Sequence, residues 1–146
     1  MSTRVLAILL GGILPALMLG LTGVFQKLSN NARIGTGPFL IVAGLTTALV
    51  GGVFLLLDRD ATIGQRSAFY TVLFGLVWAT AIGLIGIALG RFDGQISQLV
   101  PLYNMNTLVA VLIGLVVLAE WRTVDPRKLV VAAILIVIGG VLASRA

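Results

Sequence analysis

The sequence predicts an all-α polytopic membrane protein, a bundle of five transmembrane helices. Of its 146 residues, 59% are hydrophobic and only 10% are charged, whereas a soluble domain has about 25% charged residues. The apolar residues form five runs of about 19 to 23 residues, and roughly 20 helical residues cross a hydrocarbon core. The runs lack the alternation of barrel strands, and helices satisfy their own backbone in lipid.

The five runs form a single five-helix domain, residues 1–146. Its expected spans are residues 5–25, 38–57, 68–90, 99–119 and 126–144. The first run is longer than the roughly 7–15-residue apolar core of a signal peptide, so we expect it to be a retained span. The last run starts with Asp125 and Pro126, which suit an N-cap and the first position of a helix.

The charges indicate a lipid partner and a membrane orientation. The net charge is +5, and the basic residues lie between apolar runs, which favours anionic headgroups of a lipid bilayer over nucleic acid. Five spans place six basic residues on the side of the N-terminus and four on the other side. The six are Arg4, Arg59, Arg66, Arg122, Arg127 and Lys128, and the four are Lys27, Arg33, Arg91 and Arg145. The positive-inside rule therefore favours a multi-pass protein of the cell membrane with a cytoplasmic N-terminus, by a margin of two charges.

The residue types that are missing from the chain exclude several kinds of catalysis and metal binding. The chain has no cysteine and no histidine, which removes disulfides, thiol catalysis and the commonest metal ligand. The expected spans contain no Asp or Glu, although proton-coupled carriers usually place a titratable group in the membrane. We therefore expect no enzyme activity, no cofactor and no metal site.

The stretch VPLYNMNT, residues 100–107, is unusually polar for a membrane span. At helical spacing, Tyr103, Asn106 and Thr107 share one stripe with Gly114, while Asn104 lies on an adjacent stripe with Pro101. Pro101 is expected to kink the helix. An amide without a partner in hydrocarbon costs several kcal/mol, so the asparagines need partners. The stripe is interpreted as a substrate path, and the alternative is hydrogen bonding between helices.

The first and third spans offer further candidates. Pro15 is expected to kink the first span, and Gln26 and Lys27 fall near its membrane boundary. Lys27 either snorkels at a helix end or provides a gate charge for anionic or zwitterionic solutes. Trp78 is a weaker candidate for the substrate path.

Small residues recur at four-residue spacing on the first three helices. These faces are Gly12, Ala16 and Gly20; Gly44, Ala48 and Gly52; and Gly75, Ala79 and Gly83. Such faces let helices approach closely in lipid, either inside one bundle or between subunits.

The stretch from Pro101 to Ser144 resembles the two closing helices of an EamA domain of the drug/metabolite transporter superfamily. The matching features are a Pro-containing helix, a turn with Ala119, Glu120 and Thr123, and a last helix with Gly139 and Gly140. Alanine stands at position 119, where the family often has glycine. The opening LGLTGVFQKLSN resembles the first helix of that family, with Phe25 and Lys27 at matching positions.

The resemblance implies a solute carrier that works by alternating access, present here as one five-helix unit where typical members have two. It also implies a structural turn at Glu120 and Thr123. The expected function is that of a half-size transporter for a small metabolite or drug-like solute, acting as a dimer. The partner is a second copy, antiparallel or parallel, or an unlike half-transporter. The alternative is a non-transporting membrane scaffold or accessory subunit.

Overall fold

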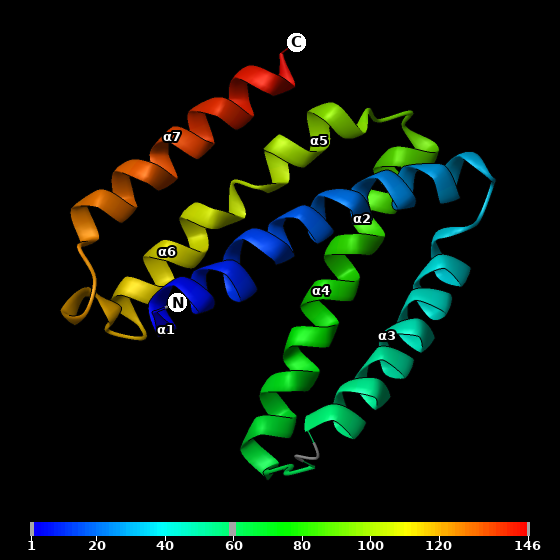
Figure 1. Ribbon diagram of the computed structural model, residues 1–146. Helices are drawn as coiled ribbons and strands as arrows, with labels where there is room; N and C mark the ends of the chain where they lie inside the picture. The colour runs from blue at the N-terminus through cyan, green and yellow to red at the C-terminus, as the bar shows by residue number, and fades with distance from the viewer. Residues whose placement is uncertain (1, 59–60, 146) are drawn as a thin grey trace. The chain divides into compact units, whose positions relative to one another are not determined.

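The computed structural model describes residues 2–58 and 61–145. It is 84% helical, with no strand in the described residues. Five helical stretches are long and apolar enough to cross a membrane (Figure 1). They are Val5–Asn31, Thr36–Asp58, Gln65–Arg91, Ile96–Val116 and Pro126–Ser144. The predicted fold class, an all-α multi-pass membrane protein, is confirmed.

The bounds of four spans differ from the expected ones, by one to three residues except at the end of the first span. The first span runs to Asn31 rather than to Phe25, and Arg33 follows it with a left-handed φ of 66°. The fourth span covers Ile96–Val116 rather than residues 99–119, and Ala119, just beyond its end, adopts a left-handed conformation. The fifth span has the expected bounds. Arg59, one of the cations counted for orientation, lies outside the described residues, and so does the side chain of Arg4.

The first span is irregular just before Pro15. It consists of α1 (Thr3–Ile8), a π-helical turn η1 (Leu9–Ile13) and α2 (Leu14–Asn31). The N–H of Leu14 donates to the carbonyl of Leu9, five residues back. Proline has no N–H to donate and crowds the carbonyl four residues earlier, and a wider π turn accommodates it. The irregularity expected at Pro15 therefore occurs in the turn that precedes it.

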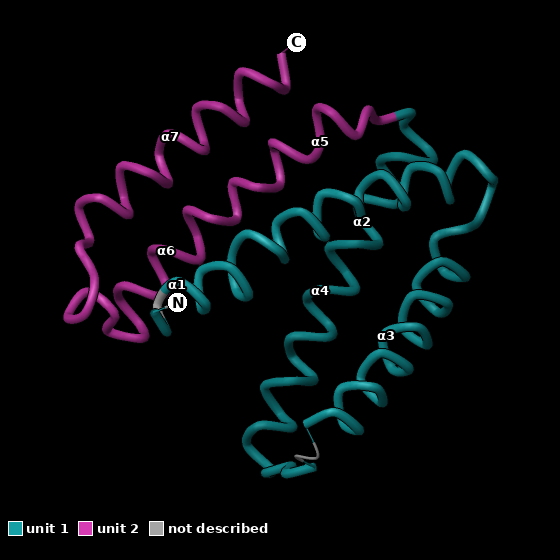
Figure 2. Tube along the Cα trace, in the orientation of Figure 1, with its two compact units in different colours: residues 1–93 teal, residues 94–146 magenta. Residues whose placement is uncertain are grey.

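The chain divides into two compact units, Met1–Asp93 and Gly94–Ala146 (Figure 2). In the first unit, α4 (Gln65–Arg91) packs against both α2 and α3 (Thr36–Asp58). In the second unit, α7 (Pro126–Ser144) packs against α5 (Ile96–Tyr103) and α6 (Asn106–Val116). A short 3₁₀ turn, η2 (Glu120–Arg122), connects α6 to α7.

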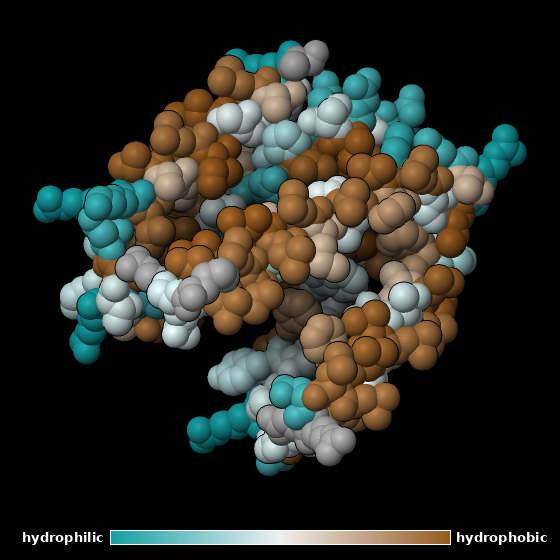
Figure 3. Space-filling model, viewed as in Figure 1, coloured by the Kyte–Doolittle hydropathy of each residue, from teal (hydrophilic) through white to brown (hydrophobic). Residues whose placement is uncertain are grey.

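The surface of the described residues is strongly apolar. Their buried hydrophobic side chains are Leu89, Leu115 and Ala133. Large apolar side chains cover the helices, such as Leu56 at 78% exposure. Figure 3 shows hydrophobic residues along the helices and hydrophilic ones mainly near their ends. Such a surface suits a hydrocarbon solvent, as expected for a protein that spans a membrane.

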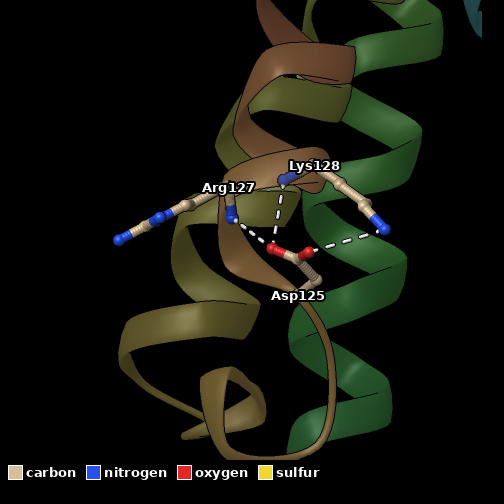
Figure 4. Close-up of polar contacts among 3 residues, drawn as sticks. All are labelled: Asp125, Arg127 and Lys128. Carbon is tan, nitrogen blue, oxygen red and sulfur yellow. Dashed lines mark hydrogen bonds and ion pairs between the residues drawn. The ribbon is translucent and has the colours of Figure 1, made fainter.

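The start of α7 has the N-cap that the sequence predicts. The Asp125 side chain accepts hydrogen bonds from the N–H groups of Arg127 at 3.1 Å and Lys128 at 3.4 Å (Figure 4). Pro126 occupies the first turn, where its missing N–H costs no hydrogen bond. The cap explains why the helix begins here, at the edge of its apolar segment.

Candidate functional site

The fourth span is broken near its middle. Helix α5 ends at Tyr103 and α6 begins at Asn106, with a tight turn at Asn104 and Met105 between them. In this turn the N–H of Met105 donates to the carbonyl of Leu102 at 3.0 Å, and the N–H of Thr107 to that of Asn104, also at 3.0 Å. Both hydrogen bonds join residues that are three apart in the sequence, so the chain is wound more tightly here than in an α-helix.

The break lies just after Pro101, where the sequence predicts a kink. Pro101 lies inside α5, and the helix continues to Tyr103 before it breaks. Proline removes one helical hydrogen bond, and asparagine is a poor residue for a helix interior because its side chain competes for backbone groups. The loss of helical structure therefore occurs at Asn104, which follows the proline by less than one turn.

The polar side chains around the break have no hydrogen-bond partners in the described part of the chain. Asn104 and Asn106 are exposed, and Tyr103 and Thr107 are half-buried. None of the four side chains makes a hydrogen bond there. In contrast, the hydroxyl of Thr46 in α3 donates to its own helix, to the carbonyl of Val42 at 2.9 Å. Each unpaired amide is costly in hydrocarbon, so the break requires water, a solute or another helix.

Gly140 of α7 packs directly against the backbone of α5. A Cβ atom at Gly140 would lie 2.6 Å from the carbonyl oxygen of Pro101 and 3.6 Å from Cγ of Met105. Gly140 is buried. Only a residue without a side chain allows the two backbones to approach this closely. The break is therefore supported from one side by α7, a contact that sequence reasoning did not identify.

The predicted stripe ends at Gly114, and this end does not open onto a cavity. Gly114 is buried in α6. A Cβ atom there would lie 2.9 Å from Oε2 of Glu120, so the Glu120 carboxylate covers this glycine. The predicted path residues therefore divide in two, because Asn104 and Asn106 remain exposed while Gly114 is closed off.

The turn after α6 is fixed by backbone geometry. Ala119 has a φ of 55°, in the left-handed region. The carbonyl of Glu120 accepts bonds from the N–H of Thr123 at 2.9 Å and from its hydroxyl at 3.1 Å. The guanidinium of Arg122 lies over the Trp121 ring at 5.2 Å, and no ion pair joins it to Glu120 in the described residues. The Glu120 main chain, rather than an ion pair of its side chain, therefore holds the turn.

Gln26 links two helices of the first unit. Its side chain is only 5% exposed, and its Nε2 atom donates to the carbonyl of Ile82 in α4 at 2.9 Å. Gly86 makes room for this contact, since a Cβ atom there would lie 3.5 Å from the same nitrogen. The structure thus gives Gln26 a role in helix packing, where the sequence suggested a solute path. Lys27, the next residue, is half-buried.

Close packing in the first unit uses a different set of small residues from the predicted faces. Glycines 83, 86 and 90 of α4 each have a side chain of α2 or α3 within 4 Å of an added Cβ atom. Five glycines of the predicted faces have no such neighbour among the described residues: Gly12, Gly20, Gly44, Gly52 and Gly75. Among the described glycines of the expected faces, only Gly83 has another side chain within 4 Å of an added Cβ atom.

The remaining path candidates lie in the first unit. Trp78 is 40% exposed on α4, and it belongs to the first unit together with Gln26 and Lys27.

Two surface hollows of about 360 Å³ each lie on single helices. One is lined by Gln65, Arg66, Phe69 and Tyr70, and the other by Arg127, Lys128, Val131, Ala132 and Leu135. The described residues contain no cluster of three or more acidic, His or Cys side chains that could hold a metal ion.

These features define a class of protein: a multi-pass membrane protein with a polar break in one span. The chain, compared with protein-family models, with curated proteins and with solved structures, matches none of them.

Proposed function

We propose that this chain is a half-size transporter for a small solute. The observation that carries the proposal is the break in the fourth span, where Asn104 and Asn106 present unpaired amides to their surroundings near the middle of an apolar helix. Broken helices inside a membrane occur where the backbone lines a cavity or is covered by protein. In many secondary transporters they form the substrate site.

The chemistry of the break suits a polar, uncharged group of the solute. Each asparagine amide offers one acceptor oxygen and two donor hydrogens, and the hydroxyls of Tyr103 and Thr107 both donate and accept. The fourth span contains no charged side chain. We propose a metabolite or drug-like molecule that makes several hydrogen bonds, carried without a proton relay in this span.

The break also provides a place for the span to bend. The turn at Asn104 and Met105 separates two helical segments, and Gly140 holds the first of them against α7. Alternating access requires such a joint near the site, so that one end of the helix moves while the other stays packed. The resemblance of the chain to EamA domains supports the same mechanism.

We further propose that the working unit is a dimer in the cell membrane. Five spans supply one repeat, and a second copy or an unlike half-transporter would supply the other. A charge difference of only two between the sides permits insertion in both orientations, which an antiparallel homodimer needs. Reporter fusions at Arg145 that signal from both sides of the membrane would support this arrangement. A single-sided signal with transport intact would exclude it and leave a parallel dimer, a monomer or an unlike partner.

A ligand screen tests the proposed function. The purified chain is heated with representatives of metabolite classes, because a ligand that binds only the folded state raises the unfolding midpoint. We expect selective stabilisation by one class, which the double variant Asn104→Leu, Asn106→Leu abolishes and the matched variant Val109→Leu, Leu112→Val retains. Flux of that ligand into proteoliposomes then separates transport from binding. Stabilisation without flux would indicate an accessory or scaffold protein.

A further inference from the structure

The first turns of α7 carry a shallow, open amphipathic hollow. Arg127 and Lys128 lie at its outer end, and Val131, Ala132 and Leu135 continue it along the helix. This spacing places all five residues on one side of α7. Because the span begins at Pro126, the two cations lie at headgroup depth and the three apolar residues lie deeper, at the depth of acyl chains.

The charges around this hollow favour an anion. Asp125 is the nearby carboxylate, and its Oδ2 atom lies 3.7 Å from Nζ of Lys128. Figure 4 shows the Arg127 side chain pointing away from both Asp125 and Lys128. Arg127 makes no ion pair in the described part of the chain. One full positive charge, that of Arg127, therefore remains uncompensated at the mouth of the hollow.

The preceding turn adds features of a membrane interface. Trp121 is exposed in η2, and the guanidinium of Arg122 lies over its ring at 5.2 Å. Tryptophan is enriched at the level of lipid headgroups. A guanidinium matches the geometry of a phosphate group, which can accept two parallel hydrogen bonds from it.

We propose that this hollow is a binding site for one anionic phospholipid. The phosphate binds Arg127, with Lys128 as a second, partly neutralised cation, and one acyl chain lies along Val131, Ala132 and Leu135. The small side chain of Ala132 leaves the space that the chain occupies. A free phosphate would use only the cations, whereas a lipid matches both halves of the hollow. The site is independent of the proposed transport.

Lipid retention by the full chain tests the proposal. The purified protein is exchanged into mixed micelles containing phosphatidylglycerol and phosphatidylcholine with identical acyl chains, and the retained lipids are counted by native mass spectrometry. We expect preferential retention of one phosphatidylglycerol. Arg127→Gln should weaken it about fivefold, as expected for one basic residue at a membrane surface. Arg145→Gln, at the other end of the same helix, is the matched control and should leave retention unchanged. Equal retention of the two lipids, or equal effects of the two variants, would overturn the site.

A second variant tests whether the shape of the hollow, and not only its positive charge, contributes to lipid binding. Ala132→Leu fills the hollow without changing charge, at an exposed position where it does not disturb packing. It should reduce retention of phosphatidylglycerol while the unfolding midpoint stays the same. Unchanged retention would show that charge alone acts, and would overturn the acyl-chain part of the proposal. Inorganic phosphate is the last probe, and we expect no competition at equal concentration. Displacement of the lipid by phosphate would identify a free-anion site instead.

Discussion

Gly140 of α7 lies so close to Pro101 of α5 that a Cβ atom on the glycine would be 2.6 Å from the proline carbonyl oxygen. The neighbouring atom belongs to the backbone, which cannot rotate away as the end of a side chain can. This contact fixes α5 against α7 immediately before the break at Asn104. The geometry of the proposed solute path therefore depends on a glycine in another helix.

Gly140→Ala should destabilise the protein. The added methyl group requires α5 and α7 to separate, and overpacking of this kind typically costs about 1–3 kcal/mol. Thermal unfolding in detergent measures the effect. Gly139→Ala is the matched control, because a Cβ atom there has no atom within 4 Å and alanine favours the helix. Equal unfolding midpoints of the two variants would contradict the close contact.

Gln26→Leu should lower stability modestly, because it removes the hydrogen bond from Nε2 to the carbonyl of Ile82. Hydrogen bonds between membrane helices contribute about 0.6 kcal/mol on average, and at most about 1.7. Thr80→Val is the control, since the Thr80 hydroxyl bonds within its own helix, to the carbonyl of Leu76. The Gln26 variant should keep ligand selectivity in the stabilisation screen. If the variant changed ligand selectivity and left stability unchanged, Gln26 would be a residue of the solute path and not a packing residue.

Ala119→Gly should stabilise the turn between α6 and η2. The φ of 55° at Ala119 costs a residue with a Cβ atom roughly 1–2 kcal/mol, which glycine avoids. The greater freedom of glycine in the unfolded chain offsets part of that gain, so we expect a net increase of about 0.5–1 kcal/mol in the free energy of unfolding. Ala110→Gly, within α6, should instead lower it by about 1 kcal/mol. A loss of stability in both variants would contradict the left-handed turn.

The membrane-spanning architecture could be predicted because it depends on local properties of the sequence. Long apolar runs identify the five spans, and the cap of α7 follows from Asp125 and Pro126 alone. In the sequence, Ala119 is distinguished only as an alanine where the EamA family often has glycine. The structure shows that Ala119 has a left-handed backbone conformation, which glycine adopts at lower cost.

The site was harder to predict because it depends on which helices meet. Helical spacing places Gly114 on the polar stripe, but the following turn folds the Glu120 carboxylate over it. Gln26 looked like a path residue, and only the gap at Gly86 of α4 shows how it becomes buried. The sequence predicts a kink at Pro101, but neither the break at Asn104 nor its support by Gly140 of α7 follows from helical spacing. Each of these differences arises from a contact between residues that are distant in sequence or separated by a turn.

The most direct test of the central claim is water access at the break. The chain has no native cysteine, so single cysteines can replace Asn104, Asn106, Val109 and Leu112 and be labelled with a membrane-impermeant thiol reagent. Val109 and Leu112 are 57% and 46% exposed and apolar, so a difference from the exposed asparagine positions cannot come from burial in the chain. A solute path predicts rapid labelling at positions 104 and 106, slow labelling at 109 and 112, and protection of the first pair by a stabilising ligand. Equally slow labelling at all four positions would show that the asparagines are covered by lipid or by another helix, and would contradict the transporter.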